Sequence, residues 1–494
     1  MAQVPLTPLW QDAAPATSVL SDQQVHTTEH ETNDSLRYNI FCVVWAIATL
    51  FHMAQSRLFA NELHYALLTL AAVLLIAKPS SVLRLVLLIA LQLYEVVARL
   101  PNITNHWIFT TFVNLTILQV LLYLVIKKRS IQVDRVVLIR TFAPLVKIEL
   151  VLLYFFVVLH KLNWDFFSTS ISCAAVLYKA QHIDGLFPAS DTFLKLNIYS
   201  TILIETIIPL FLCFKKIRNF GLLIGLVFHC VIAFNSYNGF YDFSSMVFAI
   251  YFLFIDLDFN KAGNILMKLK NSIYNLIGKY TVQYSFNKFF VLVCILLSLL
   301  LGVKILSLVF DDYFRMFWAV YSAIFIAVFL FLINKKQINK SFAVPVKVNG
   351  LFLLIPALVF LNGVSPYLGL KTESSFAMFS NLRTEGGITN HFFIPISAQI
   401  FDYQQDMVEV TSSSDILLQK MADENKLMTF FHFKNYVAYA KPAQVDYVRA
   451  GKRHSFTLAA SSPDNELLKK SPMLLRKLML FRAISKSIAQ PCQH

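Results

Sequence analysis

Long apolar runs separated by short polar connections dominate residues 39–363. A helical membrane span needs about 20 predominantly apolar residues. Within lipid, a helix is the structure in which a single segment forms all of its backbone hydrogen bonds internally. The pattern therefore predicts an all-α polytopic membrane bundle of about eleven spans. The expected spans are 39–54, 63–77, 80–100, 108–126, 142–163, 194–214, 219–235, 242–257, 289–310, 316–334 and 348–363.

Both ends of the chain differ from this bundle. Residues 1–38 are polar, with Arg37 as the only Lys or Arg, so they lack the basic start of a signal peptide and are expected to form a polar cytoplasmic tail. Residues 364–494 combine alternating segments such as Val445–Val448 with amphipathic ones such as 464–482. This change predicts a C-terminal extramembrane α+β domain.

Composition supports a membrane protein and excludes several other classes. Hydrophobic residues make up 57% of the chain and charged residues 15%, which excludes disordered, coiled-coil and small disulfide-rich proteins. The net charge of +14 has a topological explanation, since four loops carry 17 basic residues and the loops between them carry two. By the positive-inside rule, the basic loops are cytoplasmic and the C-terminal domain is extracytoplasmic, so no nucleic-acid partner is expected. The basic loops are 127–141, 215–218, 258–288 and 335–347. We expect a multi-pass protein of the bacterial inner membrane.

The cysteines and one histidine pair carry little signal. No CxxC or zinc-type spacing occurs among the six cysteines. Cys173 and Cys492 are the two expected on the oxidising side, but nothing in the sequence places them within bonding range, so both are expected to be free. His26 and His30 resemble half of a metal box without a partner, and no metal is expected.

Ionisable residues inside apolar spans are costly and mark candidate functional positions. Those near span ends are explained by snorkelling or by structural ion pairs. Glu205 lies one turn before Pro209, where it could also satisfy polar groups at a kink. The full set is His52, Arg84, Glu95, Arg99, Lys147, Glu149, His160, Lys161, Lys195, Glu205, His229, Asp256 and Lys304.

His160 and Lys161 end an apolar run at the expected outer mouth of their span. One interpretation is an interfacial anchor with a snorkelling Lys. The other is a desolvated amine that acts as a general base. His229 could be a packing residue, but it and His106 are expected on the same outer side as Lys161. If Lys161 is a neutral general base, loss of its side chain is expected to leave the bundle folded, because its desolvation cost is lost with it.

Four segments resemble a known family. Tyr154-Phe-Phe-Val-Val-Leu-His-Lys-Leu-Asn-Trp-Asp-Phe-Phe167, followed by Ser172-Cys173, is similar to the signature of HTTM-domain proteins, the bacterial homologues of vitamin K-dependent gamma-carboxylase. Asn105-His106-Trp107, Phe228-His229-Cys230 and residues 366–385, with Asn390-His391 behind them, resemble further segments of that family.

The resemblance implies a chemistry. In the carboxylase, the lysine matching Lys161 deprotonates vitamin K hydroquinone, which then reacts with oxygen and drives carboxylation of a peptide glutamate. The implied cofactor is a reduced, vitamin K-like quinone, with membrane lipid and a protein or peptide substrate as partners. Lys161 and His160 would be catalytic, and His229, His106 and Asn105 would bind the quinol.

The alternative is a non-catalytic membrane scaffold that binds lipid or quinone. Geometry separates the two hypotheses. Catalysis requires Lys161 and His229 to face one pocket that lipid can reach, whereas a scaffold allows them to point apart. A transporter is disfavoured because the chain has no internal repeat with paired interrupted helices.

Overall fold

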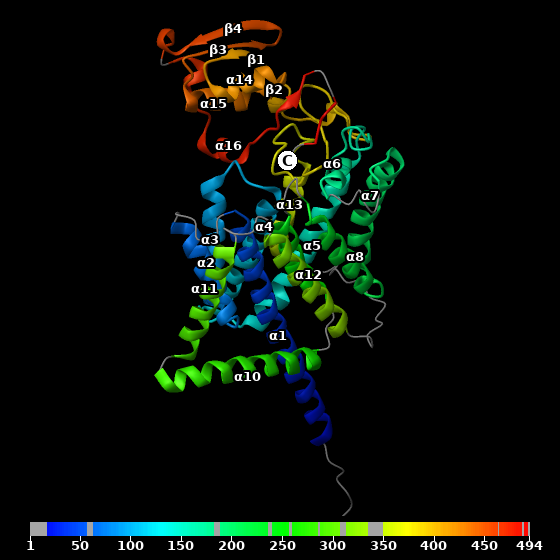
Figure 1. Cartoon of the computed structure of the whole chain (residues 1–494), viewed down its shortest axis with the longest axis vertical. Coiled ribbons are helices and arrows are strands. Elements are labelled where there is room, and N and C mark those ends of the chain that lie inside the picture. Colours follow the sequence, from blue (N-terminus) through cyan, green and yellow to red (C-terminus); the bar gives the residue numbers. More distant parts are fainter. Residues whose placement is uncertain are drawn as a thin grey trace, which may run out of the picture.

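The computed structural model is a helical bundle with a small antiparallel sheet at one end (Figure 1). The sheet and the C-terminus lie at the same end, and α1 leaves the bundle at the other. The residues described are 17–56, 63–181, 188–235, 240–255, 259–284, 287–306, 313–333, 349–462, 464–486 and 489–492. The predicted basic loop 335–347 lies outside them.

The predicted spans coincide with helices throughout the described residues. The bundle helices are α1 (Thr17–Ser56), α2 (Leu63–Ala77), α3 (Val82–Arg99), α4 (Asn105–Lys128), α5 (Arg135–Lys161), α7 (Asp191–Cys213), α8 (Arg218–Ile232), α9 (Tyr241–Phe254), α11 (Lys288–Leu306), α12 (Tyr313–Leu332) and α13 (Leu354–Val364). By length and composition, five are able to cross a membrane: Asn33–Met53, Asn105–Lys128, Arg135–Lys161, Asp191–Cys213 and Arg315–Leu332. A helical membrane bundle is therefore supported, and the count of eleven spans stays a prediction.

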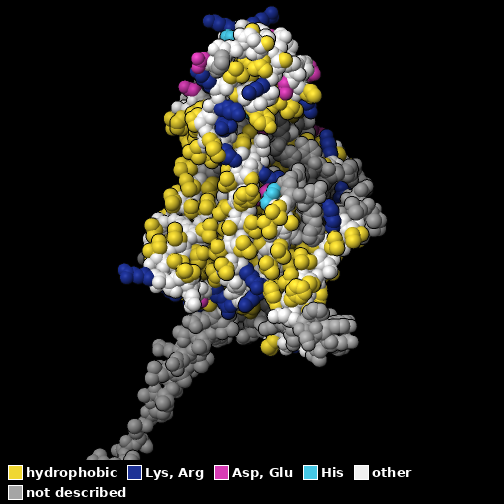
Figure 2. Space-filling view, turned by 90° about the vertical axis from the view of Figure 1, so that its left-hand side faces the viewer, with side chains coloured by type: hydrophobic (Ala, Val, Ile, Leu, Met, Phe, Trp, Pro, Cys, Tyr) yellow, Lys and Arg dark blue, Asp and Glu magenta, His cyan; other side chains and the backbone are white. Residues whose placement is uncertain are grey.

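Helix α5 illustrates why these segments form helices with one buried face. Asp134 caps its first turn, where the carboxylate accepts a hydrogen bond from the Val136 N–H at 2.9 Å. Phe142, Leu145 and Val146 then recur at helical spacing and are fully buried. Other bundle helices leave large apolar side chains exposed, and these cover the middle of the molecule in Figure 2. Such a belt is suited to lipid rather than to water.

The basic segment 258–288, predicted as a cytoplasmic connection between two spans, contains a helix that was not predicted, α10 (Phe259–Tyr284). This helix lies across the end of the bundle opposite the sheet (Figure 1). Ile265, Leu269 and Ile273 recur every four residues, as in an amphipathic helix. The polar residues interspersed with them lower the mean hydropathy of the segment without preventing a helix.

The C-terminal region contains the expected α+β structure. Its five strands pair antiparallel in the order β4-β3-β1-β2-β5. Apolar residues of β1, β3 and the helices α14 and α15 form a separate core around Phe433, Val408 and Val445. The strands are β1 (Met407–Ser413), β2 (Lys426–Thr429), β3 (Gln444–Arg449), β4 (Lys452–Thr457) and β5 (Ile484–Ser485), and the helices are α14 (Ile416–Asp423), α15 (Phe430–Ala440) and α16 (Met473–Leu478).

Residues 365–406, between the bundle and the sheet, pack directly on the bundle. The Phe376 N–H donates to Asn105 Oδ1 at 2.6 Å, and Phe376 itself belongs to the core of the bundle. The Ser374 hydroxyl donates to the Ile103 carbonyl at 2.6 Å. The compact sheet therefore begins at Met407, and the preceding segment covers the end of the helices.

Cys173 and Cys492 form a disulfide, so the expectation of two free thiols is wrong. Cys173 begins α6 (Cys173–Lys179), and the Asn381 side chain brings the chain terminus to it. Its Oδ1 accepts from the Cys173 N–H at 2.7 Å, while its Nδ2 donates to the Gln490 carbonyl at 3.0 Å. A sequence separation of 319 residues hides this proximity from sequence reasoning.

Candidate functional site

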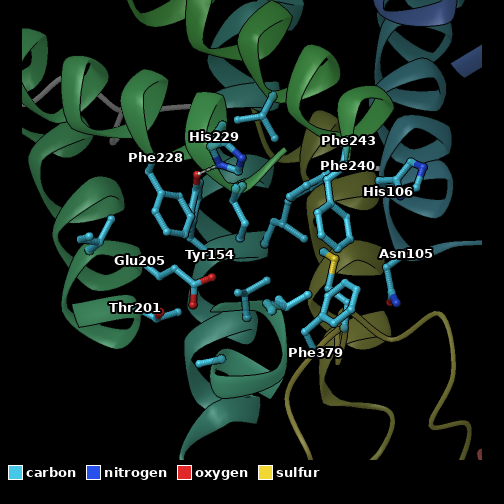
Figure 3. A pocket seen from close by; sticks show the side chains of 18 of the residues that line it. Asn105, His106, Tyr154, Thr201, Glu205, Phe228, His229, Phe240, Phe243 and Phe379 are labelled. Carbon is cyan, nitrogen blue, oxygen red and sulfur yellow. Dashed lines mark hydrogen bonds between the residues drawn. The ribbon is translucent and has the colours of Figure 1, made fainter. Parts of the chain in front are cut away.

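A cavity of about 1020 Å³ lies between α4, α5, α7, α8 and α9 and is closed by residues 373–379 (Figure 3). Its walls are mainly apolar and aromatic, and a few polar side chains project into it, as is usual for small-molecule sites. Phe220, Val227 and Val231 line the cavity and are also exposed on the flank of α8. The cavity therefore reaches the apolar outer surface of the bundle.

Four residues of α5 line the cavity, Leu153 among them, and the other three share one helical face. Tyr154, Val157 and Lys161 follow one another at intervals of three and four residues and all line it. The helix ends directly after Lys161, because Asn163 Nδ2 donates to the His160 carbonyl at 2.8 Å and its Oδ1 accepts from Phe166 N–H at 2.9 Å. Lys161 is therefore the last residue of α5, at its C-terminal end.

The Lys161 amine is buried and paired. Its Nζ donates to both carboxylate oxygens of Glu205, at 2.7 and 2.6 Å, and the two side chains are 6% and 8% exposed. This arrangement differs from the snorkelling expected of an interfacial anchor. It also changes the expected effect of removing Lys161, since the buried carboxylate would lose its partner.

His229 lies in the same cavity and is held by Tyr154. The Tyr154 hydroxyl hydrogen-bonds His229 Nε2 at 2.8 Å and also contacts the Tyr251 hydroxyl. Within the described part of the chain, His229 Nδ1 has no hydrogen-bond partner although it is buried. Gly225 permits this packing, because a Cβ there would lie 2.5 Å from the Tyr251 hydroxyl oxygen.

Asn105 and His106 also line the cavity, on the side opposite Glu205 in Figure 3. Asn105 Oδ1 accepts a hydrogen bond from the Phe376 N–H. His106 Nε2 lies 2.8 Å from Asp242 Oδ2 and 3.2 Å from the Thr104 hydroxyl. Four of the five predicted site residues thus share one cavity.

His160 is the exception, because it is directed away from this cavity. Its Nδ1 lies 2.9 Å from the Tyr367 hydroxyl and its Nε2 lies 3.2 Å from the Ser375 carbonyl. Burial raises the pKa of Tyr367, so its phenol stays protonated and available as a donor. His160 therefore ties the end of α5 to the segment that follows α13.

Sequence reasoning missed Tyr154 and Asp242 as site residues and left the role of Glu205 open. Tyr154 could have been predicted from the sequence, since it precedes Lys161 by seven residues and therefore lies on the same face of the helix. Asp242 begins α9, and only the packing of that helix against α1 and α4 brings it to the cavity. Comparisons of the chain with models of protein families, with characterised proteins and with solved structures find no match.

Proposed function

We propose that this protein is a membrane enzyme of the HTTM or vitamin K-dependent gamma-carboxylase-like type, which carries out quinol-dependent chemistry in the cavity. The observation that carries the proposal is that Lys161 and His229 face one apolar cavity that reaches the lipid-facing surface. A quinol dissolved in the membrane would enter from the flank of α8. The proposed setting is the bacterial inner membrane, with the C-terminal domain outside.

Lys161 is proposed as the base and Glu205 as the group that makes its amine available. In the resting ion pair the amine is an ammonium, which is no base. Transfer of one proton from Lys161 Nζ to Glu205 gives a neutral amine beside a carboxylic acid, and a low-dielectric cavity favours such a neutral pair. The amine then takes a proton from the quinol hydroxyl, leaving a quinolate next to an ammonium.

His229 is proposed to orient the quinol. Its Nε2 is engaged by Tyr154, which leaves Nδ1 for a hydroxyl of the bound quinol. His106 and Asn105 would contact the ligand from the opposite side. No quinol contact is proposed for His160, which we assign to positioning the end of α5.

The resemblance supplies the overall reaction. One quinol, one oxygen molecule, one carbon dioxide and one glutamate C–H give one quinone epoxide, one water and one carboxylated glutamate. One oxygen atom enters the epoxide and the other enters the water. The two quinol hydrogens and the glutamate hydrogen end as the two hydrogens of the water and one released proton, and the new carboxyl group is ionised. A protein or peptide glutamate is the proposed acceptor.

The test uses purified full-length protein in lipid nanodiscs, incubated without oxygen with vitamin K hydroquinone, bicarbonate and a glutamate-rich peptide and then exposed to oxygen. We expect mass spectrometry to detect quinone epoxide with the wild-type protein and none with Lys161→Arg. Lys195→Arg is the matched control, because Lys195 forms an exposed ion pair on α7. Quinol that binds at one equivalent but is never converted to the epoxide would overturn catalysis and support the scaffold alternative.

A further inference from the structure

Three potential metal ligands from three helices meet at the side of the cavity opposite Glu205. His52 comes from α1, His106 from α4 and Asp242 from α9, and one ligand atom of each lies within 4.8 Å of the other two. Their side chains are between 12% and 16% exposed, so the cluster is largely shielded. The mechanism proposed above uses neither His52 nor Asp242.

Two of the three distances between donor atoms are close to those of a coordination shell. Asp242 Oδ2 lies 2.8 Å from His106 Nε2 and 3.2 Å from His52 Nδ1. Ligands bound at about 2.0–2.2 Å from a zinc ion lie about 3.0–3.5 Å apart at tetrahedral or octahedral angles. A small outward movement of His106 would therefore admit an ion.

The two contacts of His52 Nδ1 conflict with each other. Its Nδ1 lies 2.5 Å from the Trp107 indole nitrogen, which only donates, and 3.2 Å from the Asp242 carboxylate, which only accepts when ionised. If Nδ1 carries a proton, two N–H donors face each other at the indole. If Nδ1 carries no proton, its lone pair faces the negatively charged carboxylate. A cation between Nδ1 and Oδ2 removes the conflict with the carboxylate.

The surroundings orient the carboxylate and leave one side open. Asp242 Oδ1 accepts from the Phe243 N–H at 2.7 Å, which aims Oδ2 at the two imidazoles. All three residues line the cavity, so a bound ion would keep a coordination position toward it. Two imidazoles, one carboxylate and an open position are the donor set of catalytic zinc and non-haem iron sites.

From this geometry we propose that His52, His106 and Asp242 bind one divalent transition-metal ion, with Zn²⁺ as the first candidate. The open position would take an anionic oxygen of whatever ligand occupies the cavity. No motif in the sequence indicates a metal at this place, because the three ligands are distant from one another in the chain. The metal proposal does not rest on the quinol chemistry proposed above, although both use His106.

The test measures metal content and affinity rather than activity. Full-length protein is purified with a tag that carries no histidine, stripped with a chelator, reloaded with Zn²⁺ and dialysed. We expect about one zinc per chain by elemental mass spectrometry for the wild type, and at least a tenfold weaker affinity in Asp242→Asn and His106→Gln. His229→Gln is the control, since it removes a cavity imidazole outside the cluster and should keep the ion.

A second measurement guards against variants that misfold. Zn²⁺ should raise the thermal unfolding temperature of the stripped wild type and of His229→Gln, and should leave that of Asp242→Asn unchanged. Zinc uptake that is equal in the wild type and Asp242→Asn would overturn the proposal. So would a stripped wild type that takes up no zinc, which would leave a purely hydrogen-bonded cluster.

Discussion

The ion pair between Lys161 and Glu205 makes a sharp prediction about stability. One Nζ serves both carboxylate oxygens, and both side chains are almost fully removed from solvent. Lys161→Met removes one partner and leaves a buried carboxylate without a counter-charge. Glu205→Gln leaves a buried ammonium in the same position. The double variant removes both charges together.

The magnitudes follow from the cost of an unpaired buried charge. Breaking a buried pair by removing one partner costs about 3–5 kcal/mol, whereas replacing both by uncharged groups is neutral or stabilising by about 1–4 kcal/mol. We therefore expect each single variant to lose about 3–5 kcal/mol of unfolding free energy and the double variant to lose none. The coupling energy between the two positions should then exceed about 3 kcal/mol.

The assay is equilibrium unfolding in mixed detergent micelles, followed by tryptophan fluorescence. Lys195→Met is the matched control, because Lys195 pairs with Asp191 at 2.7 Å on the same helix as Glu205 but in the open. It should unfold like the wild type, since solvent screens that pair. Single variants that are as stable as the double variant would refute the reasoning and would mean that water reaches the pair.

Four further predictions follow from other parts of the molecule. Lys161→Arg should lower quinol oxidation by about 10²–10⁴-fold, because guanidinium does not release its proton; a fully active variant in the epoxide assay would contradict the assignment of the base. Cys173→Ser should remove the change in gel mobility that reduction produces in the wild type and should lower the unfolding free energy by about 2–5 kcal/mol, while an unchanged mobility pattern would exclude the disulfide. With the free cysteines replaced by serine, an impermeant thiol reagent should label Ser461→Cys in whole cells and should spare a cysteine introduced in loop 215–218; the opposite pattern would invert the topology. Burial lowers the pKa of Lys371 to about 8. Between that pKa and the ordinary lysine value the unfolded chain binds one more proton than the folded chain, so the unfolding free energy should rise by about 2 kcal/mol from pH 7 to 9.5. Unfolding measured as a function of pH should show this rise in the wild type and not in Lys371→Met.

Much of the architecture could be predicted from hydropathy alone. A span must be apolar along most of its length, so runs such as 142–163 predict a helix without any tertiary information. The amphipathic helix α10 was missed for the same reason, because its polar face lowers the mean hydropathy. The disulfide of Cys173 with Cys492 was missed because loop closure over such a distance depends on the folded topology.

The candidate site could be predicted in part. Lys161 and His229 stood out because ionisable groups in apolar spans are rare, and the structure places both in one cavity. His160 stood out equally, yet a single step along a helix turns its side chain by about 100° and away from the cavity. Neighbours in sequence therefore separate, and a candidate list drawn from the chain cannot say which of the two faces inward.

By itself, the sequence determined that this is a helical membrane-type bundle with a C-terminal α+β region, because apolar run length and strand alternation are local properties of the chain. Only the tertiary structure decided that Glu205 is the partner of Lys161 and that Asp242 meets His52 and His106. Pairing of buried polar groups is set by how helices pack and rotate against one another. That packing depends on side chains far apart in the chain, and no local pattern encodes it.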